Sequence, residues 1–221
     1  VGGAEAARMA ALTLHQALSA RNGRPDEPGG TAATLLQATQ LAHREIRRRG
    51  WSDLGLRGMG TTLTAALVEG DALHLVQVGD SRALLLRHGI LTQLTRDQSM
   101  VQDMVDSGVL TPEQARSSPH RNVILQALGG EDPLEPVGGR HPLRPGDRLL
   151  LCTDGLTGVV PPEPLRSILE GENTPAAACD ALVEAALRGG APDNVTCIVA
   201  DLGAVDPSSG DPDPDSLSRT G

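Results

Sequence analysis

The sequence predicts an α+β domain in which antiparallel sheets form the centre and pairs of helices lie outside. Two observations lead to this prediction. Short apolar runs separated by turn residues fill residues 60–155, whereas apolar residues at helical spacing occupy residues 4–49 and 162–188. A parallel doubly wound fold, in which single strands and helices alternate along the chain, is disfavoured by this order.

Two helices are expected before the first strand. Small and apolar residues recur at helical spacing from Ala4 to Leu18, and Asn22-Gly23 ends this run. A second helix is expected from Thr31 to Gly50, and its last turn carries Arg47-Arg48-Arg49, which suit the negative end of a helix dipole. We interpret these arginines as a solvated helix end rather than as a nucleic-acid patch.

Two β-hairpins and an insertion follow. The turn residues Glu69-Gly70-Asp71 and His88-Gly89 each separate two apolar runs, which predicts two antiparallel hairpins. Residues 97–120 then break the strand pattern with two short helices, the second of which opens with Thr111 as its cap and Pro112 in its first turn. We therefore expect these residues to form an insertion between strands.

The rest of the chain returns to strands and closes with helices and a last strand. Apolar runs predict the strands, and helical spacing between Thr174 and Gly189-Gly190 predicts the final helix. The expected strands are residues 122–130, 134–143, 147–155 and 193–202, and the expected helices are residues 162–170 and 174–188.

One folded domain and a tail are expected. Residues 1–203 contain all the periodic segments, whereas residues 204–221 are mostly Pro, Ser, Asp and Gly with almost nothing to bury. We expect this second segment to be a disordered acidic tail or linker.

The composition narrows the classes of partner. The 221 residues carry a formal net charge of −9, and the chain has no Lys, no Phe and no Tyr, so that Trp51 is its only large aromatic residue. Without stacking platforms, this acidic chain is a poor partner for nucleic acid or an anionic membrane, but it suits a divalent cation. No apolar run could span a bilayer and no secretory signal is recognisable, so we expect a cytoplasmic protein without a membrane segment.

Three aspartates lie where predicted strands meet solvent. Asp80 follows the apolar run LHLVQVG, Asp154 follows RLLLCT, and Asp193 precedes NVTCIVADL. Acids at such strand ends can converge on one point, and Mg²⁺ or Mn²⁺ prefers carboxylate oxygens as ligands. An aspartate in such a place can equally be a turn or cap residue, so the pattern alone leaves a metal site and a structural role open.

The histidines and cysteines give weaker indications of a functional site than the three aspartates do. The six histidines show no ligand spacing such as HxxxH, so structural or surface roles are expected, with His120 at the end of the insertion as the exception to watch. Cys152, Cys179 and Cys197 show no CxxC spacing and are expected to be buried, reduced thiols. The neighbouring Asp154 should raise the pKa of Cys152, which argues against a cysteine nucleophile.

Five short motifs follow one another along nearly all of residues 1–202. In order and spacing they resemble the metal-dependent protein phosphatases, the type-2C (PPM) serine/threonine phosphatases, and in particular their bacterial branch. The motifs are Gly60-Thr61-Thr62, Gly79-Asp80-Ser81-Arg82, His120-Arg121-Asn122 with LQALGG, Thr153-Asp154-Gly155 and Asp193-Asn194.

The resemblance implies an αββα sandwich with a binuclear Mn²⁺/Mg²⁺ centre, where a metal-activated water hydrolyses phosphoserine or phosphothreonine. It implies that Asp154 and Asp193 bind one metal of the pair, and that Asp80 with Asp154 holds a weaker third ion. Residues 97–120 match the flap segment beside the cleft. The remaining motif residues, expected to support the ligands or to pack beneath them, are Ser81, Arg82, Thr153, Gly155 and Asn194.

The sequence departs from the family in one respect. Family members carry an early acidic ligand and an Asp-Gly-x-Gly-Gly motif whose Asp bridges both metals, whereas Val1-Gly2-Gly3 resembles only the end of that motif. We therefore expect a catalytic domain without its N-terminal strands. The intact parent is expected to be an active phosphatase, and the 221-residue chain to be inactive or nearly so.

The resemblance also implies partners. Phosphorylated Ser/Thr proteins are the expected substrates, a Ser/Thr kinase is the expected counterpart, and the protein is expected to be a monomer. Two alternatives remain open on the sequence: a non-catalytic, phosphatase-like binding or regulatory module, and a metal-dependent hydrolase of small phosphomonoesters.

Overall fold

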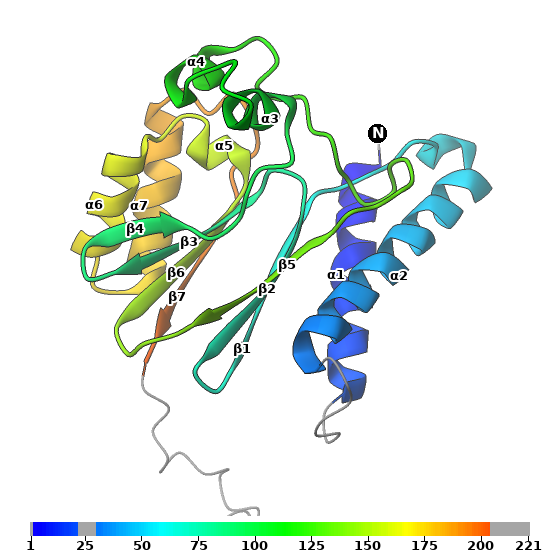
Figure 1. The fold of residues 1–221 in the computed structure, drawn as a ribbon, viewed down its shortest axis with the longest axis horizontal. Coiled ribbons are helices and arrows are strands. Elements are labelled where there is room, and N and C mark those ends of the chain that lie inside the picture. The colour runs from blue at the N-terminus through cyan, green and yellow to red at the C-terminus, as the bar shows by residue number, and fades with distance from the viewer. Residues whose placement is uncertain (1, 22–29, 204–221) are drawn as a thin grey trace, which may run out of the picture.

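Two antiparallel sheets lie between two pairs of helices in the computed structural model, which describes residues 2–21 and 30–203 (Figure 1). Helices α1 (Gly3–Arg21) and α2 (Gly30–Ser52) lie on one side. Helices α6 (Pro162–Gly171) and α7 (Pro175–Arg188) lie on the other. The predicted α+β sandwich is therefore confirmed. The predicted tail at residues 204–221 and most of the loop between the first two helices lie outside the described residues.

The first sheet has the strand order β1-β2-β5. Strands β1 (Leu63–Glu69) and β2 (Ala72–Val78) form the hairpin that the sequence predicts around Gly70, and β5 (Val137–Pro142) pairs antiparallel with β2. Every residue of β2 is buried because this strand is central and α2 packs against it.

The second sheet has the order β4-β3-β6-β7, and all its neighbours are antiparallel. Its strands are β3 (Arg82–Arg87), β4 (Ile90–Gln93), β6 (Asp147–Cys152) and β7 (Cys197–Leu202). Helix α7 packs on β7, and α6 packs on β3 and β4.

The period-2 alternation of β3 divides the core between two layers. Leu84 and Leu86 belong to the apolar cluster shared with α6 and α7. Ala83 and Leu85, on the opposite face, pack in the same cluster as Leu73 of the other sheet. The two sheets therefore meet across an aliphatic layer, which fixes the relative position of the strand ends that carry the aspartates.

Residues 97–120 form the predicted insertion at one end of the sandwich (Figure 1). Helix α3 (Met100–Asp106) is capped by Ser99, and α4 (Pro112–Ser117) by a capping box between Thr111 and Gln114.

Two short elements were not predicted, the 3₁₀ turn η1 (Leu54–Leu56) and helix α5 (Asp154–Thr157). None of the described helices is long and apolar enough to cross a membrane.

The predicted strand at residues 122–130 is wrong. This stretch makes only two isolated bridges, Ser99 with Ile124 and Thr61 with Leu128. The bridges join two different segments, so no continuous ladder forms, and Val123, Ile124 and Leu125 remain 37–46% exposed.

The last strand begins later than predicted. Strand β7 starts at Cys197, so Asp193 lies in the loop before it and not at the strand's first residue. Upstream of Cys197 the ladder continues for one backbone bond, from the N–H of Thr153 to the carbonyl of Thr196. Further upstream, the hydroxyl of Thr153 bonds the carbonyl of Asn194 in place of a backbone partner, which ends the sheet there.

Candidate functional site

Asp80 lies on the tight turn between β2 and β3. The preceding Gly79 has a φ of +100°, and a Cβ on this residue would lie 2.8 Å from the Cβ of Thr62. A residue with a side chain is therefore excluded both by backbone conformation and by space. The turn that presents Asp80 depends on this glycine.

Ser81 holds the same turn to the first sheet. Its hydroxyl lies 3.0 Å from the hydroxyl of Thr62, and its carbonyl accepts a hydrogen bond from the hydroxyl of Thr64 at 2.8 Å. The serine is buried, and both its hydroxyl and its carbonyl are engaged.

Asp154 and Asp193 are brought together by contact between their neighbours. Asp154 is the first residue of α5, directly after β6. The backbone of Asn194 lies against Gly155, where a Cβ would overlap the Asn194 carbonyl oxygen and lie 3.0 Å from its carbonyl carbon. The Asp193 carboxylate accepts a hydrogen bond from the Asn194 N–H at 2.7 Å.

Burial and neighbouring negative charge raise the pKa values of Asp80 and Asp154. The pKa of Asp80 is raised to about 6, mainly by burial and next by the negative charges of Asp154 and Asp97. Burial also raises the pKa of Asp154, with Asp193 as the next cause. Like-charge repulsion thus links Asp80 to Asp154 and Asp154 to Asp193, and the convergence of all three on one metal ion stays a prediction.

The donor set fits a hard divalent cation, since its members are carboxylates whose mutual repulsion a cation would relieve. Within the described residues, Asp80, Asp154 and Asp193 form no ion pair. In the same part of the chain, no group of three or more His, Cys, Asp or Glu side chains is close enough to hold a metal ion. The aspartates therefore approach one another without forming a closed ligand shell.

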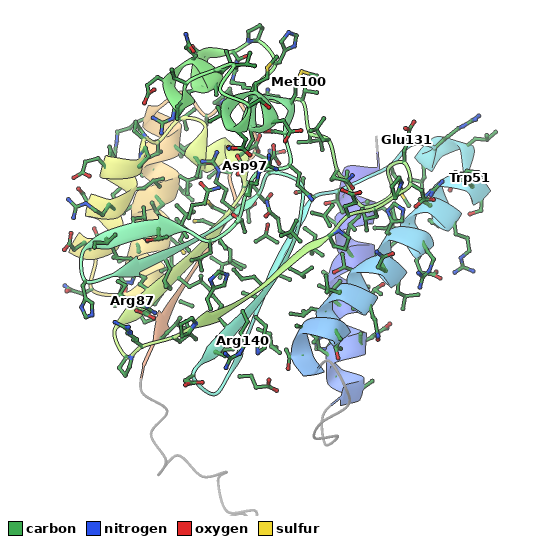
Figure 2. The ribbon with its side chains drawn as sticks, viewed as in Figure 1. Trp51, Arg87, Asp97, Met100, Glu131 and Arg140 are labelled. Carbon is green, nitrogen blue, oxygen red and sulfur yellow. The ribbon has the colours of Figure 1, made fainter. Side chains whose placement is uncertain are left out.

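Asp97 is a fourth acid near the site, and the sequence analysis missed it. It lies between the sheets and α3 (Figure 2). The Arg82 Nε donates to Asp97 Oδ1 at 2.9 Å and Arg82 Nη2 donates to Oδ2 at 2.6 Å, a bidentate pair that is largely shielded from water. Asp97 thereby fixes the position of the Arg82 guanidinium.

Two glutamines at the same turn were also missed. Gln77 and Gln98 are buried, and both bond to the backbone of Gly79. A glutamine at the end of a strand or before a helix does not stand out in the hydrophobic pattern of the sequence. The role of these two residues becomes apparent only from the groups to which they bond. The Asp97-Gln98-Ser99 run directly before α3 is the one local hint, because Ser99 is a recognisable helix cap.

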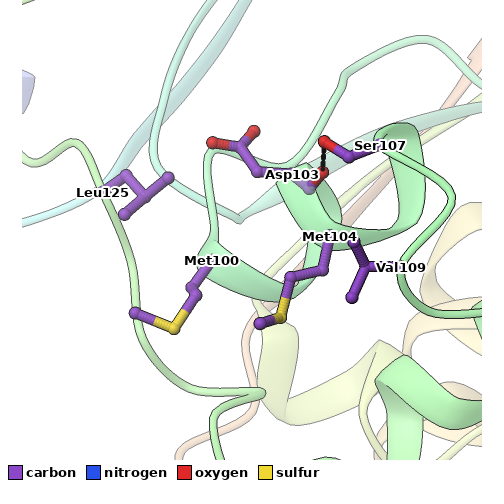
Figure 3. A pocket seen from close by; sticks show the side chains of 6 residues that line it. All are labelled: Met100, Asp103, Met104, Ser107, Val109 and Leu125. Carbon is purple, nitrogen blue, oxygen red and sulfur yellow. Dashed lines mark hydrogen bonds between the residues drawn. The ribbon is translucent and has the colours of Figure 1, made fainter.

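The insertion carries a shallow cavity of about 240 Å³ (Figure 3). The side chains of Met100, Met104, Val109 and Leu125 supply its apolar lining. Asp103 at its rim pairs with Arg96 at 2.6 Å, which fixes α3 to the strand side of the insertion. None of Asp80, Asp154 and Asp193 lines this cavity.

The cysteine and histidine side chains, which are the other candidate nucleophiles and bases, differ in their burial. Burial raises the pKa of Cys152 to about 12, so the predicted direction is confirmed but burial, not Asp154, is the main cause. All three cysteines are free, and Cys152 is the buried one, whereas Cys179 and Cys197 are only half-buried. His43 is buried, with Nε2 3.0 Å from Asp132 Oδ1, and burial lowers its pKa. His120 is exposed on the insertion.

Comparison with known proteins identifies relatives of this architecture. The chain is 45% identical over 205 residues to the serine/threonine protein phosphatase PstP of Mycobacterium tuberculosis, a match that covers 91% of this chain and 39% of PstP. The chain therefore spans well under half the length of this curated relative. It is also 37% identical over 169 residues to the serine/threonine phosphatase stp of Listeria monocytogenes, covering 76% of this chain and 67% of stp.

Solved structures agree. The crystal structure of Mycobacterium tuberculosis PstP/Ppp matches with a TM-score of 0.77 at 45% identity, over 92% of this chain and 85% of that one. The PstP catalytic domain in complex with two manganese ions matches with a TM-score of 0.73 at 43% identity, over 89% and 81%. The S. agalactiae serine/threonine phosphatase matches with a TM-score of 0.80 at 33% identity, over 91% and 84%.

The family model described as protein phosphatase 2C matches residues 1–187, which include Asp80 and Asp154 with their flanking turns. The fold, these turns and the relatives agree on one assignment: the chain belongs to the protein phosphatase 2C family.

Proposed function

We propose that this chain carries catalytic residues of a serine/threonine protein phosphatase, which hydrolyses phosphoserine and phosphothreonine with a metal-activated water. The observation that carries the proposal is the contact of Gly155 with Asn194, which brings Asp154 and Asp193 together beside Asp80, whose pKa is raised by burial and by the charge of Asp154. Membership of the phosphatase family supports it.

The proposed ligands of Mn²⁺ or Mg²⁺ are Asp80, Asp154 and Asp193. A cation bound there supplies an acidified water and attracts the phosphate group. The chain's own residues provide the positioning: contact between Gly155 and Asn194 holds two of the ligand loops together, and Ser81 fixes the third. The choice of metal is supported by the related PstP catalytic domain, which was crystallised with two manganese ions.

The proposed substrates are proteins phosphorylated on Ser or Thr, with a Ser/Thr kinase as the counterpart enzyme. We place the reaction in the cytoplasm and propose that the catalytic domain, residues 1–203, acts as a monomer. Nucleic acid is not a proposed partner, since the chain is acidic and its single large aromatic residue is Trp51.

We further propose that the 221-residue chain alone turns over little substrate. Among its described residues no three or more His, Cys, Asp or Glu side chains lie close enough together to hold a metal ion, and its sequence contains no Asp-Gly-x-Gly-Gly motif to supply a bridging carboxylate. The same observation favours a second candidate, a non-catalytic module that binds or regulates a partner through the phosphatase fold.

Phosphate release from a phosphothreonine peptide and from p-nitrophenyl phosphate, with Mn²⁺ and with EDTA, tests these proposals. The product of the complete gene is expected to release phosphate only with metal, and Asp154→Asn is expected to remove at least about two orders of magnitude of the rate. Full activity of the 221-residue chain would overturn the proposal about that chain. No metal-dependent release by the gene product would overturn the enzyme and favour the module.

A further inference from the structure

Gln98 stands where three segments meet. Its side-chain Oε1 accepts a hydrogen bond from the Gly79 N–H at 2.7 Å, and its Nε2 donates to the Glu135 carbonyl at 2.8 Å. The side chain is 8% exposed, so both bonds are shielded from water. A buried amide with both ends engaged holds its partners in one relative position.

The backbone of Gln98 joins the same partners. Its N–H donates to the Gly79 carbonyl at 2.9 Å, and its carbonyl accepts from the Leu125 N–H at 2.8 Å. Gly79 is thus bound at its N–H and at its carbonyl by one residue, and the Gly79 carbonyl also accepts from Gln77 Nε2 at 2.9 Å. No other described group bonds the Gly79 N–H.

Asp80 follows Gly79 directly, so the direction of its carboxylate depends on this turn. The φ of +100° at Gly79 is a conformation that only glycine adopts freely, and a glycine has no side chain with which to hold it. The restraint must therefore come from hydrogen bonds, and the side chain of Gln98 provides the one at the N–H.

We propose that Gln98 is a positioning residue for Asp80, which holds the Gly79-Asp80 turn so that the carboxylate faces the place where a divalent cation binds. The inference rests on the proposed metal site. Without the Gln98 side chain, the buried Gly79 N–H loses its partner and the turn shifts to find another. Groups that orient a metal ligand in this way typically change metal affinity by 10–100-fold when they are removed, so we expect at least about a tenfold loss.

The test measures Mn²⁺ affinity by the electron paramagnetic resonance signal of free Mn²⁺, on the full 221-residue chain. The variants are Gln98→Met, which keeps size but loses both hydrogen bonds, Asp80→Asn, and the double variant. Gln102→Met is the matched control, because Gln102 lies in the same insertion and its Nε2 bonds only Asp106, at 2.7 Å. Thermal unfolding without metal reports the structural cost of each change.

Gln98→Met is expected to weaken Mn²⁺ binding about tenfold or more, and Gln102→Met to leave it unchanged. In the double-mutant cycle the effects of Gln98→Met and Asp80→Asn on Mn²⁺ affinity should be non-additive, since both act through one carboxylate. A glutamine that merely stabilises the fold would lower the unfolding temperature and give additive or no effects on Mn²⁺ affinity, and that result overturns the proposal.

Two further outcomes separate this inference from the proposed function. If Asp80→Asn weakens Mn²⁺ binding and Gln98→Met does not, the role of Gln98 is refuted and the metal site stands. If Asp80→Asn leaves binding unchanged, the metal site at Asp80 is refuted and the role of Gln98 falls with it. Should Gln98→Met fail to fold, Gln98→Glu keeps an acceptor for the Gly79 N–H, and loss of the Mn²⁺ site in that variant overturns the proposal.

Discussion

The backbone carbonyl of Asn194 lies directly against Gly155, in the space that a Cβ would occupy. Thr153, one residue before Asp154, adds a second tie, because its hydroxyl accepts a hydrogen bond from the Thr196 N–H at 3.1 Å. Two proposed metal ligands from distant parts of the chain are therefore placed by contacts between their neighbours in sequence.

Gly155→Ala should destabilise the protein and disturb the loop of Asp193. The new methyl group overlaps backbone, which cannot rotate away, so we expect a loss of about 1–3 kcal/mol in the free energy of unfolding. Urea denaturation measures it. Gly171→Ala is the matched control, since no atom lies within 4 Å of its Cβ position at the end of α6. Equal stability of the two alanine variants would show that the Asn194 backbone moves freely.

Asp147→Asn should be among the more damaging single changes in the second sheet. Asp147 is 2% exposed, and Arg87 donates to both its carboxylate oxygens, at 2.7 and 2.6 Å. The change removes the charge partner of the Arg87 guanidinium, which otherwise donates, among the described residues, only to the Pro142 carbonyl, and we expect this to cost about 3 kcal/mol of unfolding free energy. Glu184→Gln, which breaks the exposed pair with Arg188, should cost less than about 0.5 kcal/mol by the same denaturation measurement.

The same pair gives acid sensitivity. Hydrogen bonds from Arg87 hold the pKa of Asp147 below its usual value, so the native state binds fewer protons than the unfolded state in acid. The stabilisation is therefore complete above the unfolded pKa and is lost as the pH falls through the lowered native value. Unfolding midpoints measured from pH 6 downward should fall less steeply in Asp147→Asn. A slope identical to that of the wild type would contradict this assignment.

Asp80→Asn should stabilise the metal-free protein and reduce the stability that the protein gains from added Mn²⁺. The pKa of Asp80 is raised to about 6, so the native state holds an extra proton between about pH 4 and pH 6. Stability from this group is present below the unfolded pKa and is lost as the pH rises through 6, by at most about 3 kcal/mol.

Thermal unfolding in EDTA at pH 5 and pH 7.5 measures this difference. The wild type should lose stability between the two pH values, and Asp80→Asn should lose less and gain less from added Mn²⁺. Glu131→Gln, at an exposed position, should behave as the wild type does. If Asp80→Asn is less stable than the wild type at pH 7.5 without metal, the claim that the Asp80 carboxylate lies in an unfavourable, like-charged environment is wrong.

Cys152 should resist alkylation in the folded protein. Burial raises its pKa to about 12, so almost no thiolate is present at pH 8, and the side chain is shielded within the cluster beneath α7. Iodoacetamide treatment followed by peptide mass spectrometry should modify Cys152 at least about tenfold more slowly in the native protein than in urea. Rapid native modification would show that β6 opens at its metal-site end.

The sequence was sufficient for most of the architecture. Hairpins at Gly70 and His88-Gly89, the cap at Thr174 and the insertion at residues 97–120 all follow from local turn and cap chemistry, which acts within a few residues. Residues 122–130 were misassigned because an apolar run does not specify its pairing partner, and this one bridges two separate segments.

Some residues of the candidate site could likewise be predicted from the sequence and others could not. Asp80 and Asp154 were found from the strands that precede them, whose apolar patterns are strong. Asp97 and Gln98 were not found, because their importance lies in the partners they reach, Arg82 and Gly79, which the order of residues does not reveal. Proximity of this kind becomes visible only after the two sheets are packed.

The aliphatic core has a consequence for anyone who follows the folding of this protein by fluorescence. The single tryptophan, Trp51, is 80% exposed near the end of α2, with the Arg47 guanidinium 5.9 Å from its ring centre. Its native emission should already resemble that of an indole in water, and the chain has no tyrosine to supplement it. Unfolding of the sheets would thus leave the tryptophan emission nearly unchanged, whereas a molecule that binds over the indole ring would quench or shift this emission.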